Sequence, residues 1–195
     1  MNSSMIKNEL FVEKYRPEKI SDCILPNHLK TSFENIINTG NVPHMLLTGP
    51  SGSGKTSVAV SICKELDLQH LMINGSSERN IDTFRDIMEN YAGKASINGS
   101  LKILIIDEAD YLNSVSTQPA LRNFMEKYYK NCRIIFTANH GSKLIEPIHS
   151  RCSSFNFWFT SDEKMLLNIR FLDRLKHILD QESINYEENA LINLF

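Results

Sequence analysis

The sequence predicts an α/β fold in which helices flank a parallel five-stranded sheet. Short apolar runs alternate with amphipathic segments along the chain, as in folds that connect parallel strands by helices. Residues 103–106 (ILII) form a continuous apolar run, which is typical of a strand covered on both faces. The chain has 195 residues, enough for one domain or for one domain and part of a second.

The predicted elements follow in order along the first 160 residues. Five short apolar segments are the predicted strands, at 44–48, 70–73, 102–106, 133–137 and 154–159. Apolar residues at helical spacing predict helices between them, at 55–65, 82–91 and 118–129. We therefore expect residues 1–160 to form one α/β domain.

The pattern changes after residue 160. Thr160 and Glu163 have the spacing of a capping box, which predicts the start of a helix. One apolar stripe is expected along this helix, formed by Met165, Ile169, Leu172, Leu175 and Leu179. A second helix is predicted after Asn185, and no Gly, Lys or Arg ends it before the last residue. Residues 161–195 are thus expected to begin a helical domain that is truncated.

The composition excludes several classes of protein. Hydrophobic residues make up 42% and charged residues 23%, which is unlike a disordered chain, a collagen or a coiled coil. Lys and Arg number 21 against 23 Asp and Glu, so the net charge does not predict binding to nucleic acid. The net charge does not exclude a local basic patch that binds nucleic acid. The four cysteines, Cys23, Cys63, Cys132 and Cys152, show neither zinc-ligand spacing nor a disulfide framework. With no secretory signal and no apolar run of membrane-spanning length, we expect a cytoplasmic protein and no membrane partner.

Residues 49–56 (GPSGSGKT) match G-x-x-x-x-G-K-[ST], the pattern of a phosphate-binding loop. Glycines in such a loop let backbone N–H groups point at phosphates, and the following helix presents its N-terminus to the same anion. Lys55 would neutralise phosphate oxygens and the Thr56 hydroxyl would bind Mg²⁺. A chance match in a surface turn is rare, and the strand-like run before the loop makes it rarer. The expected nucleotide-binding residues are Gly49, Pro50, Ser51, Gly52, Ser53, Gly54, Lys55, Thr56 and Ser57.

Two acids, Asp107 and Glu108, follow the buried strand at 102–106. The carboxyl edge of a parallel sheet is where such folds bind ligands. Because adjacent strand residues point to opposite faces, we expect the two acids to have different roles. Asp107 suits the coordination of Mg²⁺, and Glu108 suits the polarisation of the attacking water. The alternative is a solvated strand end with two ordinary acids.

Two further polar residues follow later in the chain. Asn139 comes after the fourth predicted strand, where its amide could hold water or the γ-phosphate; a turn residue is the alternative. Arg151 precedes the fifth strand and is poorly placed to reach its own phosphates, so we expect an arginine finger that acts on a neighbouring subunit. A surface salt bridge is the alternative for Arg151. Residues 107–110 also spell the box DEAD of a helicase family, but those helicases need two such domains.

Together these motifs resemble the clamp-loader ATPases of the AAA+ family, most closely the replication factor C small subunit and its T4-type phage counterpart. The segments that carry the resemblance are VEKYRP (12–17), PHMLL (43–47), NGSSER (74–79), QPALRNFME (118–126) and SRC (150–152). The resemblance implies a P-loop AAA+ fold, with ATP and Mg²⁺ as cofactors. It also implies a function in which ATP binding and hydrolysis load a sliding clamp onto primer–template DNA.

The resemblance assigns roles to individual residues. It implies an adenine site formed by Val12, Tyr15, Arg16, Pro17, Ile24 and Leu25. It makes Arg79 a switch that holds the carboxylate of Glu108 until DNA binds, and Arg122 part of the coupling to DNA. DNA backbone contacts are expected near Ser116 and Thr117, and a pentamer of clamp-loader subunits and the sliding clamp are the other expected partners. Clamp loaders continue through a complete helical lid and a collar, whereas this chain has a partial lid with no assigned sensor arginine.

Three alternatives remain beside this interpretation. Another AAA+ remodeller of DNA, such as a branch-migration motor or a helicase loader, is disfavoured by the YRP and SRC segments. A non-hydrolysing ATP-binding scaffold subunit would lack Lys55, Glu108 or Asn139, and all three are present. A small-molecule kinase would need an acceptor pocket and an arginine lid, which the sequence does not indicate.

Overall fold

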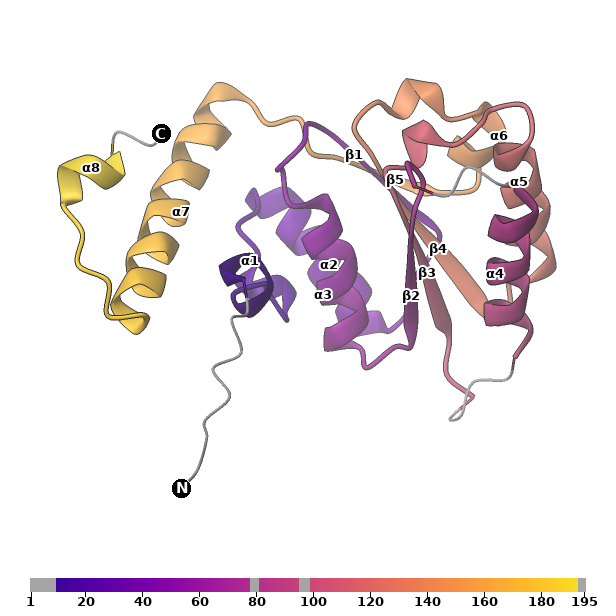
Figure 1. Cartoon of the computed structure of the whole chain (residues 1–195), viewed down its shortest axis with the longest axis horizontal. Coiled ribbons are helices and arrows are strands. Elements are labelled where there is room, and N and C mark those ends of the chain that lie inside the picture. Colours follow the sequence, from indigo (N-terminus) through magenta and orange to yellow (C-terminus); the bar gives the residue numbers. More distant parts are fainter. Residues whose placement is uncertain (1–9, 78–80, 95–98, 193–195) are drawn as a thin grey trace.

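A parallel five-stranded sheet forms the centre of the computed structural model, which describes residues 10–77, 81–94 and 99–192. The strands are β1 (Met45–Thr48), β2 (His70–Asn74), β3 (Lys102–Asp107), β4 (Cys132–Ala138) and β5 (Ser153–Asn156). They lie in the order β2-β3-β4-β1-β5 and every neighbouring pair is parallel (Figure 1). The predicted α/β class with a parallel five-stranded sheet is confirmed.

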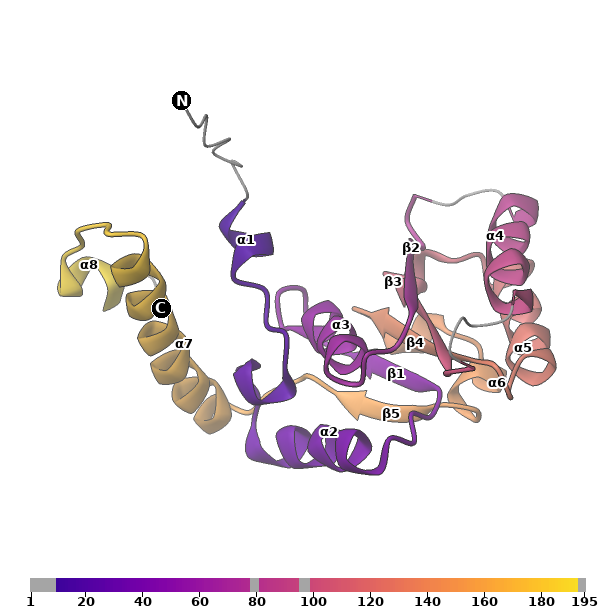
Figure 2. The same ribbon diagram turned by 90° about the horizontal axis from the view of Figure 1, so that it is seen from below.

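Helices cover both faces of the sheet (Figures 1 and 2). One face carries α2 (Asn27–Thr39) and α3 (Lys55–Glu65). The other carries α4 (Ile81–Gly93), α5 (Thr117–Lys127) and α6 (Glu146–His149). The short elements are α1 (Phe11–Lys14) and the 3₁₀ turns η1 (Ile20–Asp22), η2 (Ala109–Tyr111) and η3 (Gly141–Lys143).

The two cores follow from the alternation of side chains along each strand. Met45 and Leu47 of β1 pack into the core below α2 and α3, whereas Leu46 packs into the core below α4 and α5. In β3 the same alternation sends Ile103 and Ile105 to one side and Leu104 and Ile106 to the other. A strand buried on both faces therefore needs a continuous apolar sequence, which is the pattern that predicted it.

Several element boundaries differ from the predicted ones. The sequence analysis missed α2, whose buried residues are Leu29 and Phe33 and which ends before Gly40 at φ 63°. The fifth strand ends at Asn156 rather than at 159: the N–H of Phe157 still donates to the carbonyl of Thr48, but the pairing with β1 stops there. The predicted helix 118–129 is α5, which begins and ends slightly earlier.

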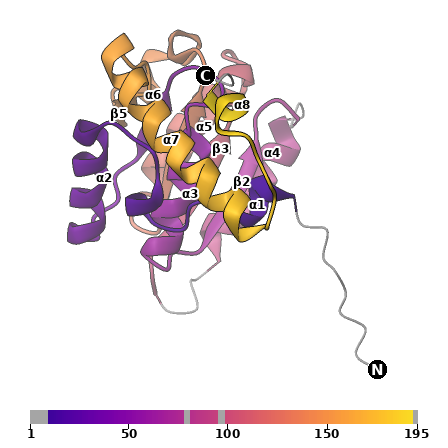
Figure 3. The ribbon, with the colours of Figure 1, turned by 90° about the vertical axis from the view of Figure 1, so that its left-hand side faces the viewer.

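The C-terminal part consists of α7 (Ser161–Gln181) and α8 (Glu188–Ile192). The capping box at the start of α7 is present as predicted, between Thr160 and Glu163. Figure 3 shows α7 passing across the end of the molecule, and Figure 1 shows α1 between α7 and α3. The predicted apolar stripe is wrong for Met165 and Ile169, which are exposed, whereas Leu172, Leu175 and Leu179 are half-buried. A different face of the helix, described below, turns toward the rest of the chain.

In the described part of the chain, no helix combines the length and the apolar character that crossing a bilayer requires.

Candidate nucleotide-binding site

Three loops meet at the carboxyl edge of the sheet. The phosphate-binding loop follows β1, Glu108 follows β3, and Asn139 follows β4. Because β4 lies between β1 and β3, these loops are neighbours. They enclose a cavity of about 220 Å³. Its lining residues are Ser51, Gly52, Gly54, Lys55, Thr56, Ser57, Asp107, Glu108, Thr137, Ala138 and Asn139.

The conformation of the phosphate-binding loop depends on its glycines. Gly52 and Gly54 have φ angles of 76° and 92°, which residues with a side chain rarely adopt. Gly49 is needed for close approach, since a Cβ there would lie 2.6 Å from the Cβ of Phe157. Helix α3 begins at Lys55, directly after the loop, so its N-terminal N–H groups face the same space.

The ammonium group of Lys55 is held inside the loop. It donates to the carbonyls of Gly49 (2.8 Å) and Pro50 (2.7 Å) and to Oδ1 of Asn139 (3.0 Å). Burial lowers the pKa of Lys55, and the nearby carboxylates of Asp107 and Asp110 oppose that shift. The structure thus brings together the lysine of the phosphate-binding loop and the amide predicted after the fourth strand.

Thr56 and Asp107 are suited to Mg²⁺. The Thr56 hydroxyl donates to Oδ1 of Asp107 at 2.7 Å, so the two side chains meet although 51 residues separate them. Hydroxyl and carboxylate oxygens are the hard ligands that Mg²⁺ prefers, and the ion commonly completes its shell with water and substrate phosphates. Among the described residues no cluster of three His, Cys, Asp or Glu side chains would bind a metal by itself. The donor set fits a metal that enters together with a phosphate ligand.

The two acids do not lie on opposite faces of a strand, so the geometric premise for their different roles is wrong, and the roles themselves stay a prediction. Strand β3 ends at Asp107, and Glu108 turns into a left-handed conformation with φ 54° and ψ 42°. Both side chains consequently line the same cavity. Their surroundings still differ: Asp107 accepts from two hydroxyls, whereas the Glu108 carboxylate makes no hydrogen bond or ion pair with the described residues.

Asp110 is a buried site residue to which the sequence analysis gave no role. Its carboxylate accepts the backbone N–H groups of Asn139 (3.2 Å) and His140 (3.3 Å), and the residue is only 6% exposed. This contact fixes the backbone of the loop after β4, and with it the amide that reaches Lys55. Its place in the DEAD sequence was the one available signal.

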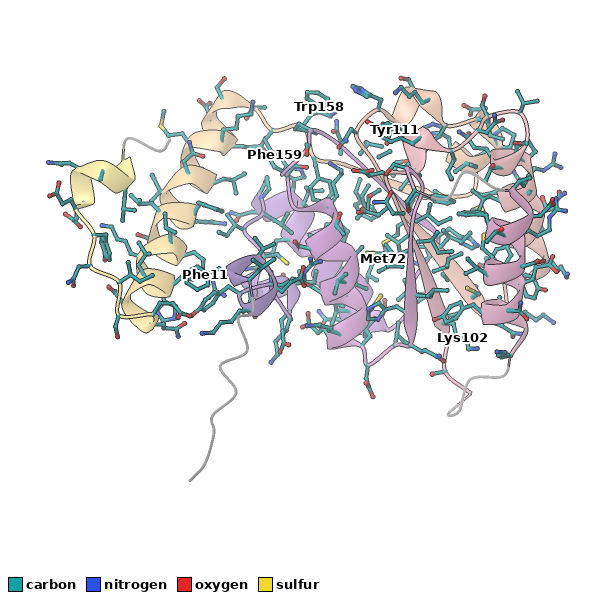
Figure 4. All side chains as sticks on the ribbon, viewed as in Figure 1. Phe11, Met72, Lys102, Tyr111, Trp158 and Phe159 are labelled. Carbon is teal, nitrogen blue, oxygen red and sulfur yellow. The ribbon has the colours of Figure 1, made fainter. Side chains whose placement is uncertain are left out.

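A second, larger cavity of about 690 Å³ lies between the N-terminal segment, the phosphate-binding loop and α7. All six residues of the predicted adenine site line it: Val12, Tyr15, Arg16, Pro17, Ile24 and Leu25. Phe11 and Phe159, labelled in Figure 4, lie on the side of the molecule that faces α7 and also line the cavity. A mostly apolar cavity with a few polar groups is typical of a site for a small organic molecule. Arg79, the predicted switch, lies outside the described residues.

Helix α7 closes the far side of this cavity. The lining residues share one helical face: Lys164, Leu167, Asn168, Phe171, Arg174, Leu175 and Ile178. The predicted stripe shares only Leu175 with this face, although the face's spacing of three and four residues was visible in the sequence. The side chains of Lys164 and Arg174 make no hydrogen bond or ion pair with the described residues, so their charges remain available to an anion.

Polar contacts hold α7 to the N-terminal segment. The Glu182 carboxylate accepts hydrogen bonds from the Lys14 ammonium and the Tyr15 hydroxyl. Nearer the start of α7, Arg170 donates to the carbonyl of Leu25 at 3.2 Å. The wall that carries the predicted adenine site is thus tied to the helix opposite it.

Similarity to known proteins decides the family. Residues 45–159 match the ATPase family associated with various cellular activities, AAA. The chain belongs to this family. It is 39% identical over 180 residues to the sliding-clamp-loader large subunit of Enterobacteria phage T4, covering 91% of this chain and 56% of that protein. It is 38% identical over 197 residues to the replication factor C small subunit of Methanosarcina acetivorans, covering 97% of this chain and 56% of that protein.

These relatives confirm the resemblance to clamp-loader ATPases. The AAA chain spans about half the length of the curated relatives it matches. Among solved structures, the Holliday junction branch migration motor RuvB of Thermotoga maritima superposes with a TM-score of 0.68 over 91% of this chain and 58% of that one. The identity is 21%, so this similarity concerns the AAA fold alone.

Arg151 lies away from the nucleotide site of this AAA domain. It lines neither cavity and donates to Oε1 of Glu126 (2.6 Å) and to the carbonyl of Pro147 (2.8 Å). The bond from Arg151 lowers the pKa of the Glu126 carboxyl. Both side chains are partly exposed, and such ion pairs are easily exchanged. The surface salt bridge is therefore present in the single chain, and the action on a neighbouring subunit stays a prediction.

Proposed function

We propose that this chain binds Mg·ATP and hydrolyses it as the ATPase subunit of a sliding-clamp loader, which couples hydrolysis to loading of the clamp onto primer–template DNA. The observation that carries the proposal is that Lys55, Thr56, Asp107, Glu108 and Asn139 line one cavity at the sheet edge. The names of the T4 and Methanosarcina relatives support the clamp-loader part.

Each side chain of the site has a role that its contacts support. The Lys55 ammonium would exchange its loop carbonyls for phosphate oxygens, which attract it more strongly because they are charged. Thr56 and Asp107 would hold Mg²⁺, which when bound neutralises charge on the phosphates. The Glu108 carboxylate makes no hydrogen bond or ion pair with the described residues, and it would accept the proton of the attacking water. Asn139, which is already bonded to Lys55, would orient that water or the terminal phosphate.

The larger cavity would hold the base and sugar of ATP. Its wall from the N-terminal segment includes Val12 and Tyr15, and the phosphate-binding loop connects it to the smaller cavity. Arg16, Lys164 and Arg174 outnumber the acid Asp22 around it, a charge balance that favours an anionic nucleotide. Residues 1–160 would then be the nucleotide-binding domain, and residues 161–195 the start of a helical lid.

Assembly and DNA binding complete the proposal. Arg151 would reach the phosphates of a neighbouring subunit, and other clamp-loader subunits, the clamp and primed DNA would be the partners. Ser116, at the start of α5, is exposed and suited to a backbone phosphate, whereas the side chain of Thr117 is buried and is not. Arg122 is exposed beside Glu126 and stays a candidate for coupling to DNA.

Two substitutions test the chemistry. Glu108→Gln keeps the size of the side chain but accepts no proton, so it should bind Mg·ATP and lose turnover. Asp107→Asn should instead raise the Mg²⁺ concentration that ATP binding requires. Identical behaviour of the two variants, measured by steady-state hydrolysis and by Mg²⁺ titration of ATP binding, would refute the division of roles.

A mixing experiment tests the action of Arg151 between subunits. A Glu108→Gln chain can still donate Arg151, and an Arg151→Ala chain can still supply Glu108. Their mixture, at high concentration, should hydrolyse ATP faster than either variant alone. No gain in an assembly of proven stoichiometry would make Arg151 a structural residue.

Stimulation by partners tests the clamp-loader assignment. ATP hydrolysis should rise when sliding clamp and primer–template DNA are added together. A four-way DNA junction serves as the control, because a branch-migration motor would respond to it instead. Stimulation by the junction alone would overturn the clamp-loader assignment and leave the ATPase assignment standing.

A further inference from the structure

Thr137 joins the ends of β3 and β4 through its side chain. It is 2% exposed and lies one residue before the end of β4. Its hydroxyl donates to Oδ1 of Asp107 and accepts the backbone N–H of Glu108 at 3.1 Å. A single hydroxyl therefore contacts both acids of the site.

The position of this hydroxyl follows from the strand pairing. The β3–β4 register ends at the pair Ile106 and Phe136. Beyond that pair, Glu108 leaves the strand direction, and its N–H would lack a partner in β4 without the Thr137 hydroxyl. The side chain of Thr137 thus continues the connection between the two strands past the end of their backbone ladder.

The backbone of Glu108 needs such support. Its φ of 54° is in the left-handed region, which is unfavourable for a residue with a side chain. A conformation of this kind persists only when the surroundings fix it. Thr137 binds the N–H of that residue and the carboxylate of the one before it, so it restrains the turn at both ends.

We propose that Thr137 is a positioning residue for ATP hydrolysis. Its hydroxyl holds the Asp107 carboxylate and the Glu108 peptide in one frame, so that the metal-binding acid and the water-activating acid keep a fixed relation. The Thr56 hydroxyl also bonds to Asp107, but it does not connect the two acids in this way. Thr56 belongs to the phosphate-binding loop, on the other side of the site. The proposal rests on the proposed function of this site.

Two substitutions at this buried position separate the effect of the hydroxyl from the effect of the side chain's shape. Thr137→Val keeps the branched shape and removes the hydroxyl, whereas Thr137→Ser keeps the hydroxyl. A hydrogen bond to a charged group contributes enough that Thr137→Val should lower kcat about tenfold or more, with KM for ATP at saturating Mg²⁺ nearly unchanged. Thr137→Ser should retain most of the turnover.

A second readout does not depend on turnover. The Mg²⁺ concentration for half-maximal binding of a fluorescent ATP analogue should rise at least about threefold in Thr137→Val, because Asp107 has lost a donor that orients it. The same midpoint should stay near the wild-type value in Thr137→Ser. Thermal unfolding of all variants establishes that they are folded, and Thr137→Ala replaces the valine variant if that one is not.

The outcomes separate the inference from the proposed function. If the wild-type chain binds no ATP analogue, the proposed function fails, and with it the basis of the inference. If the wild-type chain binds but Thr137→Val matches it in kcat and in Mg²⁺ midpoint, the inference alone is overturned. Equal losses in the valine and serine variants, with lowered melting temperatures, would also overturn it, because they would assign Thr137 a purely structural role.

Discussion

His44 is a titratable side chain that the fold buries. It lies just before β1 and is 4% exposed. Its Nδ1 accepts the N–H of Ile134 at 2.9 Å, so the proton of the neutral ring is on Nε2, which is buried and has no hydrogen-bond partner among the described residues. Burial, and to a smaller extent the guanidinium of Arg133, lowers the pKa of His44 from 6.5 to about 4.

This shift makes the stability of the chain depend on pH. Because the folded pKa lies below the unfolded value, the unfolded chain binds a proton first as the pH falls, and the free energy of unfolding decreases. The contribution of His44 is fully present above about pH 6.5 and is lost as the pH falls to about 4. At about 1.4 kcal/mol for each pKa unit, the whole loss is about 3 kcal/mol, of which about 2 kcal/mol is lost by pH 5.

The variant His44→Asn isolates this effect. Its side-chain oxygen can accept the N–H of Ile134, and it does not titrate. Urea unfolding without nucleotide, at about pH 7.5 and about pH 5, should show the wild-type chain losing about 2 kcal/mol more than the variant. Carboxylates that titrate in both proteins cancel in this difference. Parallel losses within about 0.5 kcal/mol would refute the reasoning, since they would mean that His44 titrates normally in the folded chain.

Three further predictions concern the nucleotide site. Gly49→Ala should lower the melting temperature and block ATP binding, because the new Cβ would lie 2.6 Å from the Cβ of Phe157; normal binding would show that the loop can shift. Asp110→Ala should cost about 1–3 kcal/mol in denaturant unfolding and reduce turnover, since the N–H of Asn139 loses its acceptor; unchanged turnover would contradict the role of that loop. Glu182→Ala should weaken binding of an ATP analogue severalfold, because the N-terminal wall of the larger cavity loses its tie to α7; unchanged affinity would show that the tie does not shape the site.

The fold was predictable where two independent signals coincided. Helix α3 has its predicted bounds because the phosphate-binding motif marks its start and apolar spacing marks its length. Helix α2 was missed although Leu29, Phe33, Ile36 and Ile37 have helical spacing and pack into one core; no side-chain cap marks its start after Pro26. The end of β5 was placed too late because the apolar run continues through Phe157 to Phe159, and an apolar run alone does not reveal where the strand leaves its neighbour.

The site was predictable as a set of residues but not as a set of contacts. The motifs predicted Lys55, Asp107 and Asn139, because the binding of phosphate and metal restricts which residue types can occupy these positions. The hydrogen bonds of Thr137 and Glu182 join segments far apart in the chain, and local spacing carries no information about such pairs. The inward face of α7 was misassigned because that helix is apolar on more than one side and the sequence does not show which side meets the cavity.

Equilibrium binding of a fluorescent ATP analogue tests the central proposal, nucleotide binding by the phosphate-binding loop, most directly. The wild-type chain, Lys55→Ala and Lys127→Ala should be titrated with and without Mg²⁺. Lys127 is a matched control, because it is an exposed lysine of α5 whose ion pair with Glu89 lies outside both cavities. We expect saturable, Mg²⁺-dependent binding by the wild-type chain and Lys127→Ala, and a loss of at least about 100-fold in Lys55→Ala, since a buried cation is removed from its phosphate partner. Wild-type affinity in Lys55→Ala, or no binding by the wild-type chain, would contradict the proposal.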